Sequence, residues 1–122
     1  MKINHITDFD FNLGYLEELF YLYEDNDLMK IIFRFKDKDL IVTITDLDEL
    51  ELFMEEHIKI INEEKIKKSI LLGKKIMWSW ALTNQQGYND AFQFEFINDK
   101  DEVKIQLLAI ANRIKCYSLK EY

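Results

Sequence analysis

The chain of 122 residues contains no proline, three glycines and one cysteine. A single cysteine cannot form an internal disulfide, so the fold depends on its core rather than on cross-links. Three scattered glycines exclude a glycine-rich phosphate-binding loop. Because proline is absent, the edges of any β-sheet must be protected by charge, bulges or covering segments.

Long apolar runs are also missing. No window approaches the roughly 18 uncharged apolar residues of a membrane-spanning helix, and the first residues lack the apolar stretch of a signal peptide. We therefore expect a cytoplasmic protein that does not enter a membrane. The length predicts that residues 1–122 form one domain around one core.

Charge is plentiful but unevenly spread, with a formal net charge of -7. The acidic residues of one lysine-free segment are Asp46, Asp48, Glu49, Glu51, Glu55 and Glu56, and a lysine-rich segment follows at 65–75. Phosphate and anionic lipid repel an acidic protein, so we expect no nucleic acid or membrane partner and favour a basic protein partner. The alternative is that acidic side chains simply keep the protein soluble.

Alternation of apolar and polar residues predicts several β-strands. Phe92, Phe94 and Phe96 alternate with polar residues, which indicates a strand with a buried aromatic face. Strands are also expected around Trp78 and Trp80 and, on the same alternation, at 103–107 and 114–119. In the first half, residues 15–24, 28–35 and 40–45 predict an antiparallel meander with turns at 25–27 and 37–39.

One segment favours a helix. Ile58, Ile61, Ile66 and Ile70 approximate one helical face, and Gly73 would end the helix. Residues 46–53 either extend the meander or begin this helix. The predicted fold class is α+β, mostly antiparallel β-sheet with one principal helix packed on it.

A polar loop between the two aromatic strands offers candidate binding residues. Its side chains with hydrogen-bonding capacity are Asn84, Gln85, Gln86, Tyr88 and Asp90. These amides either tie down a tight loop or form a recognition surface, since an amide carries both a donor and an acceptor. Together with Asp46, Asp48, Glu49 and Glu51, they make up the predicted partner-binding set.

Catalytic chemistry finds little support in the sequence. No histidine or cysteine lies near the polar loop to form a nucleophile with a base. Asp46, Asp48 and Glu51 with His57 are the densest candidates for metal ligands, but their spacing matches no known loop. We predict no catalytic residue, no cofactor and no metal site.

A motif in the second half resembles one family. Gly73 is followed by Trp78, Trp80, Leu82 and then Thr83-Asn84-Gln85-Gln86-Gly87-Tyr88, with Asp90 after it. This pattern resembles the hallmark of a family of short uncharacterised bacterial proteins, a domain of unknown function, and Asp48-Glu49-Leu50 fits it as well. The resemblance implies no activity. Small acidic proteins of this kind are also loosely similar to immunity proteins, which neutralise a toxin.

Two functional hypotheses follow. In the first, the chain is an immunity or antitoxin type protein whose acidic residues and polar loop bind a basic protein. In the second, Trp78, Trp80, Tyr88 and Asn84 line the pocket of a small-ligand-binding protein or enzyme. Against both, the tryptophans could simply belong to the core. A homodimer through an unprotected strand edge is also possible.

Overall fold

The computed structural model describes residues 13–83 and 89–119, and the side chains of 81–90 and 119 lie outside the description. The described residues form nine strands and no helix. In chain order the strands are β1 (Leu16–Glu24), β2 (Asp27–Phe35), β3 (Asp39–Ile44), β4 (Leu50–Glu55), β5 (Glu64–Lys65), β6 (Lys75–Thr83), β7 (Asn89–Ile97), β8 (Glu102–Ile110) and β9 (Arg113–Leu119). The described part of the protein is therefore all-β, and the predicted α+β fold class is wrong.

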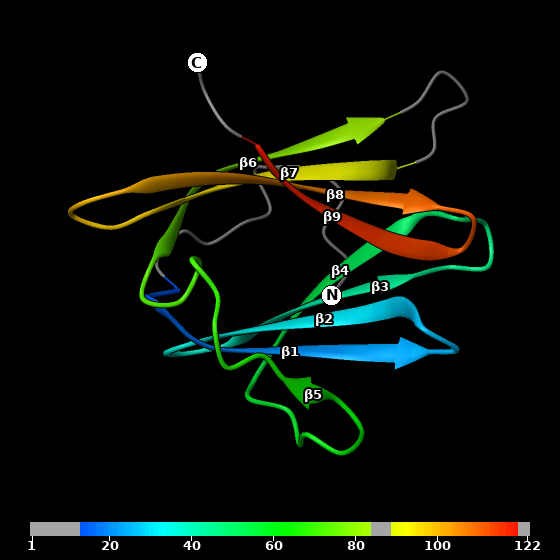
Figure 1. The fold of residues 1–122 in the computed structure, drawn as a ribbon, viewed down its shortest axis with the longest axis horizontal. Helices are drawn as coiled ribbons and strands as arrows, with labels where there is room; N and C mark the ends of the chain where they lie inside the picture. Colours follow the sequence, from blue (N-terminus) through cyan, green and yellow to red (C-terminus); the bar gives the residue numbers. More distant parts are fainter. Residues whose placement is uncertain (1–12, 84–88, 120–122) are drawn as a thin grey trace.

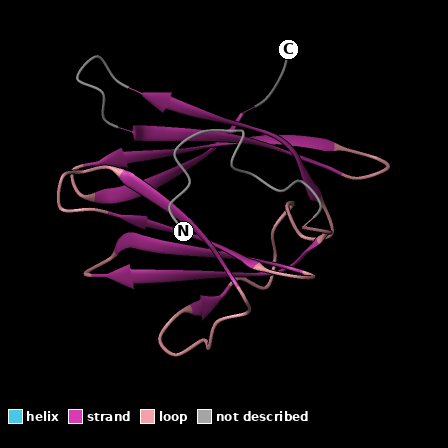
Figure 2. Ribbon diagram, turned by 180° about the vertical axis from the view of Figure 1, so that it is seen from behind, coloured by secondary structure: helices cyan, strands magenta, loops and turns pink. Residues whose placement is uncertain are grey.

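The strands form two antiparallel sheets that pack on each other (Figures 1 and 2). The first, sheet A, has the order β4-β3-β2-β1-β5, and the second, sheet B, has the order β6-β7-β8-β9. Apart from β5 and the passage from β4 to β6, neighbours along the chain are neighbours in a sheet, as in a meander. The predicted first meander is confirmed and continues into β4, which settles the alternatives for residues 46–53.

The core lies between the two sheets and is rich in phenylalanine. Phe33 of sheet A lies 6.2 Å from Phe94 and 5.9 Å from Phe96 of sheet B, measured between ring centroids. Phe92 is buried beside them. The strand alternation predicted for 92–96 is confirmed, because one face is buried in this core and the other faces away from it.

The predicted principal helix is wrong. Residues 56–63 follow β4 without regular structure, and residues 66–74 form turns and loops. The isoleucines counted as one helical face point to different places: Ile58 packs on the outer face of sheet A, Ile66 packs against the main core, and Ile61 and Ile70 are exposed. A helix whose apolar residues do not share one buried face gains little from packing.

The segment of residues 56–63, the cover segment, lies on the outer face of sheet A. Beneath it a second, smaller core is formed by Phe20, Ile32 and Ile41, with Ile58 packed against them. Sheet A therefore has apolar residues on both of its faces. A short irregular segment does the covering that the sequence pattern had assigned to a helix.

The β1–β2, β3–β4 and β8–β9 turns lie at the same end of the sandwich (Figure 1). The β1–β2 turn and the β8–β9 turn each have two central residues with positive φ, Asp25 and Asn26 in the first and Ala111 and Asn112 in the second. This conformation belongs to the tight two-residue turns that match the twist of paired strands. The β3–β4 turn and the ends of β6 and β7 complete this end.

Candidate functional site

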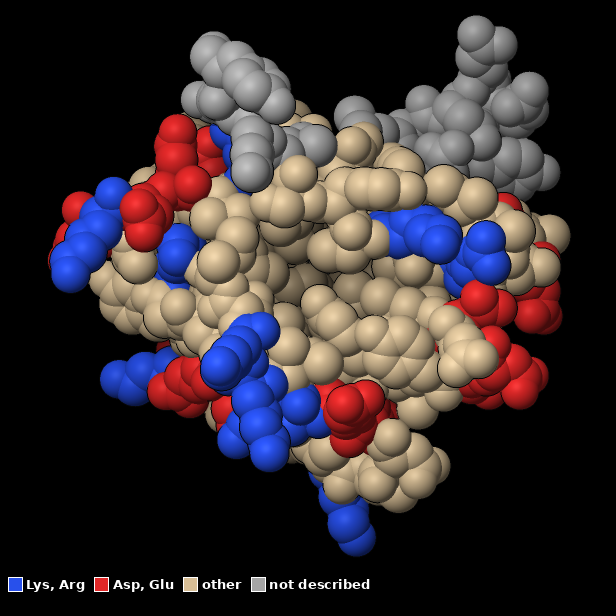
Figure 3. Space-filling model, viewed as in Figure 1, with Lys and Arg blue, Asp and Glu red and all other residues tan. Residues whose placement is uncertain are grey.

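Acidic residues collect at the end where the turns lie. We call this region the acidic end, and its acidic residues are Glu24, Asp25, Asp27, Asp46, Asp48 and Glu49. They come from the β1–β2 and β3–β4 turns, which are separated in the sequence but adjoin the same β8–β9 turn. Figure 3 shows acidic side chains grouped at this end, on the right of the view.

Contacts between the sheets hold the acidic end in one geometry. The Asn112 backbone N–H donates to Oδ1 of Asp48 at 2.8 Å. The Arg113 guanidinium donates to Oδ1 of Asp27 at 3.1 Å. Within the β3–β4 turn, Oγ1 of Thr45 accepts hydrogen bonds from two backbone N–H groups, each at 3.2 Å. A surface held in this way loses little conformational freedom when a partner binds.

Exposed apolar side chains lie among these acids. Leu47, between Asp46 and Asp48, is 68% exposed. Tyr23 near the end of β1 and Ile110 at the end of β8 are also exposed. Apolar residues surrounded by charged ones resemble the composition of protein-binding surfaces, in which an apolar centre supplies affinity and a charged rim directs association.

The structure separates the predicted acidic residues. Asp46 is exposed in the β3–β4 turn, and Glu49 is half-buried beside it. Asp48 has a structural task as well, because its carboxylate holds Asn112 and its φ of 60° shapes the turn. Glu51 is the second residue of β4 and lies on the outer face of sheet A, paired with Thr43 of β3.

The predicted amide residues can be placed only in part. Asn84, Gln85, Gln86 and Tyr88 lie outside the described residues, as does the side chain of Asp90. The strands that lead into this segment are paired through Thr83 and Asn89. These strand ends lie at the same end of the sandwich as the β1–β2 and β3–β4 turns (Figure 1).

Two aromatic residues assigned to the core in one interpretation are exposed. Trp78 is 51% exposed and Trp80 is 39% exposed, on the outer face of sheet B. The expectation that the tryptophans belong to the core is wrong, because the inner positions of β6 are taken by Ile76 and Ser79. A hollow among the described residues lies in the loop before β6, lined by Lys67, Lys68, Ser69, Ile70 and Leu72.

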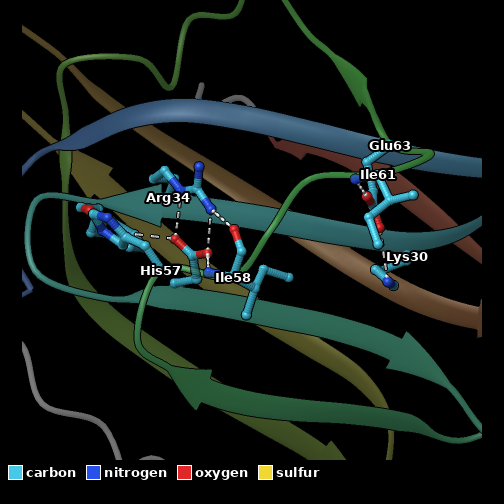
Figure 4. A network of polar contacts seen from close by, with 8 residues as sticks. Lys30, Arg34, His57, Ile58, Ile61 and Glu63 are labelled. Atoms are coloured by element: carbon cyan, nitrogen blue, oxygen red, sulfur yellow. Dashed lines mark hydrogen bonds and ion pairs between the residues drawn. The ribbon is translucent and has the colours of Figure 1, made fainter.

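A polar network that the sequence did not predict fastens the cover segment to sheet A (Figure 4). Arg34 makes two hydrogen bonds of 2.9 Å to the fully buried carboxylate of Asp39 and a third to the Ile58 carbonyl oxygen. The Ile58 N–H donates to Oδ2 of Asp39 at 2.9 Å. The hydrogen bond to Asp39 raises the pKa of Arg34. The sequence analysis placed Asp39 in the turn at 37–39. The short separation of five residues between Arg34 and Asp39, across that turn, is the only sequence signal for the ion pair.

A second anchor holds the cover segment further along. The carboxylate of Glu63 accepts hydrogen bonds of 3.0 Å from the Ile61 N–H and from the Lys30 ammonium. These two bonds lower the pKa of Glu63 to about 2, and the bond from the Ile61 N–H has the larger effect. His57 adds a contact of 2.8 Å between its Nε2 and the Phe35 carbonyl oxygen. The network is structural, since each group in it has a protein partner.

Catalytic groups do not converge in the described part of the chain. Burial raises the pKa of the Cys116 thiol to about 11, although part of the residue reaches the surface, so the thiol stays protonated at neutral pH. His57 lies against sheet A, whereas Cys116 belongs to sheet B. Within residues 13–83 and 89–119, no group of three or more histidine, cysteine, aspartate or glutamate residues could hold a metal ion.

The same described residues contain no helix long and apolar enough to cross a bilayer.

Comparison with known proteins gives a family without an activity. No curated protein matches the chain, and no solved structure matches it. One family model matches along residues 1–122. The expectation of a domain of unknown function is thereby confirmed, and the chain belongs to the family of unknown function DUF6334.

Proposed function

We propose that this protein binds a basic protein partner through the acidic end and acts in the cytoplasm as an immunity or antitoxin type protein. The observation that carries the proposal is the combination, at one end of the sandwich, of acids from two separate turns with the exposed side chains of Leu47 and Ile110. Acids speed and direct association with a basic surface, and the apolar residues supply anchors that a partner buries.

The contacts of the acidic end favour binding of a folded protein. Asp48 and Asp27 are each held by a partner from the β8–β9 turn, so the two sheets present these turns in a fixed relation. Neighbouring strands lie about 4.8 Å apart, so the turns together span a surface wider than a small molecule requires. A preformed surface of this width suits a complementary protein face.

The test starts with capture of the tagged protein's partner from its own cells at low salt. The acidic-end variant carries Glu24→Lys and Asp46→Lys, two exposed positions. Its matched control carries Glu17→Lys and Glu56→Lys, which are equally exposed but lie near the opposite end. Both variants change the net charge equally and leave Asp27 and Asp48 in their structural contacts.

We expect the association rate of the captured partner to fall about 10-fold or more in the acidic-end variant at low salt, with a smaller difference at high salt. The control should associate nearly as fast as the unmodified protein. Leu47→Ser should instead speed dissociation, because it removes an anchor rather than a charge. Equal association rates for the two lysine variants would refute the proposal.

A further inference from the structure

We propose that the outer edge of β6, with which no strand among the described residues pairs, bonds to β6 of a second copy of this chain and so joins two copies of sheet B into one continuous eight-stranded sheet. Trp78 of each copy would lie directly opposite Trp80 of the other. This inference does not depend on the acidic end or on its partner.

The edge of β6 differs from the other sheet edges. The other edge strands each carry two charged residues, which are Glu51 and Glu55 in β4, Glu64 and Lys65 in β5, and Arg113 and Lys115 in β9. In β6, by contrast, residues 76–83 carry no charge. Among residues 13–83 and 89–119, no strand pairs with the second edge of β6. Charge is the usual means of preventing edge-to-edge association, and this chain has no proline to replace it.

The backbone of β6 is suitably oriented for pairing. Ser79 is fully buried, including its main-chain atoms. Backbone groups that pointed to the outer edge would be accessible, so this burial indicates that the N–H and C=O of Ser79 bond to Phe94, its partner in β7. In an antiparallel sheet these groups alternate in direction along a strand. Trp78 and Trp80 consequently present their N–H and C=O groups to the free edge, where a second strand can bond with them.

The sequence about Ser79 is symmetric, which favours a second copy over an unrelated strand. An antiparallel pair related by a two-fold axis at Ser79 places residue 78 opposite residue 80 twice. Both contacts are then between tryptophans, and aromatic side chains directly opposite each other stabilise a pair of strands. Since the net charge is -7 per copy, an uncharged contact strand also limits repulsion.

The exposed tryptophans are the surface that this pairing would bury. They are 51% and 39% exposed in the single chain, and they are the only two tryptophans in the sequence. Fluorescence therefore reports on β6 alone. Because the paired strands run in opposite directions, the two acidic ends of the dimer would point away from each other and each would remain free for a partner.

The test measures the mass of the full chain by sedimentation at about 100 micromolar, where a specific interface of micromolar affinity is saturated. We expect twice the chain mass of 14.8 kDa, and on dilution a loss of dimer that coincides with a change in tryptophan emission. A chain that remains monomeric at this concentration would overturn the proposal and leave the edge to a different protein.

Charge variants then identify the edge and the register. The two-aspartate variant (Trp78→Asp, Trp80→Asp) and the two-lysine variant (Trp78→Lys, Trp80→Lys) should each be monomeric, because like charges face each other. An equimolar mixture of the two should form a heterodimer. The swapped variant (Trp78→Asp, Trp80→Lys) should dimerise by itself only if residue 78 faces residue 80.

The matched control places two acids elsewhere on the same sheet, at the exposed positions Ile110→Asp and Tyr117→Asp of β8 and β9. It should stay dimeric. Dimers that persist in both charge variants would show that another surface is used and would overturn the proposal. If the two-aspartate variant does not fold, the two-lysine and swapped variants still decide between these results.

Discussion

The outer faces of the two sheets differ in what covers them. On sheet A, Phe20, Ile32 and Ile41 lie under the cover segment, and the buried Arg34–Asp39 pair fastens that segment in place. On sheet B, Trp78 and Trp80 are open to solvent. Both faces carry large apolar side chains, so hydrophobicity alone does not determine which is buried. A buried ion pair and a short irregular segment make the difference.

The comparison indicates where interactions with other molecules belong. A face already covered by its own chain has its polar groups satisfied internally, as Asp39 and Glu63 show. The tryptophans of sheet B remain as apolar surface without such cover. Exposed apolar patches of this kind usually mark a contact with another molecule.

The largest expected effect comes from breaking the ion pair under the cover segment. Asp39→Ala leaves the Arg34 guanidinium without its carboxylate and the Ile58 N–H without its acceptor. Removing one partner of a buried pair costs about 3–5 kcal/mol. We expect a loss of this size in the free energy of unfolding, measured in urea.

A double variant separates the ion pair from packing. Replacing both partners, with Arg34→Leu and Asp39→Leu, leaves no unpaired charge and should destabilise less than Asp39→Ala alone. A single variant that loses under about 1 kcal/mol would show that the pair does not hold the cover segment.

A somewhat smaller effect is expected for the apolar part of the same face. Phe20→Ala removes the largest side chain of the small core and its contact with the Arg34 guanidinium, which lies 5.4 Å from the ring centroid. We expect a loss of about 3 kcal/mol in urea unfolding. The variant should also increase the rate of proteolysis within residues 56–63, because these residues would lose their contacts. Protease resistance equal to that of the unmodified protein would contradict this role of the small core.

Acid should weaken the second anchor of the cover segment. The folded pKa of Glu63 is lowered from 4.5 to about 2, so its carboxylate stabilises the fold above pH 4.5 and this contribution is lost as the pH falls toward 2. This shift corresponds to roughly 3 kcal/mol, which solvent screening reduces, so we expect about 2 kcal/mol of unfolding free energy to be lost over this range. Glu63→Gln should reduce the pH dependence, and an unchanged dependence in that variant would assign it to other carboxylates.

The strands could be predicted from the sequence because alternation reports directly on burial. Phe92, Phe94 and Phe96 are inside the core, as their spacing indicated. Trp78 and Trp80 have the same spacing but face outward. Alternation shows that residues share a face of the strand, but it does not show which face is covered. The helix prediction failed for a related reason. Isoleucines at intervals of three to five residues also fit an irregular segment that contacts two surfaces in turn.

The candidate site was predictable only in composition. The acids of residues 46–49 were evident as a run, but their meeting with the β1–β2 turn depends on the sheet order, which the sequence does not state. Asp48 also holds Asn112, 64 residues further along, and no local pattern indicates such a distant contact. The structural role of Asp39 could not be predicted, because Asp39 follows two residues that indicate a turn.

The smallest effect is expected on the open face of sheet B, where Tyr117 lies at the surface of β9. Tyr117→Ser should change the free energy of unfolding by less than about 0.5 kcal/mol, because Tyr117 is 46% exposed and lies outside both cores. The contrast with Phe20→Ala makes the comparison of the two faces quantitative in one urea experiment. If Tyr117→Ser instead destabilises the fold as much as Phe20→Ala does, the outer face of sheet B is covered in solution, and its tryptophans would not be available to a second copy.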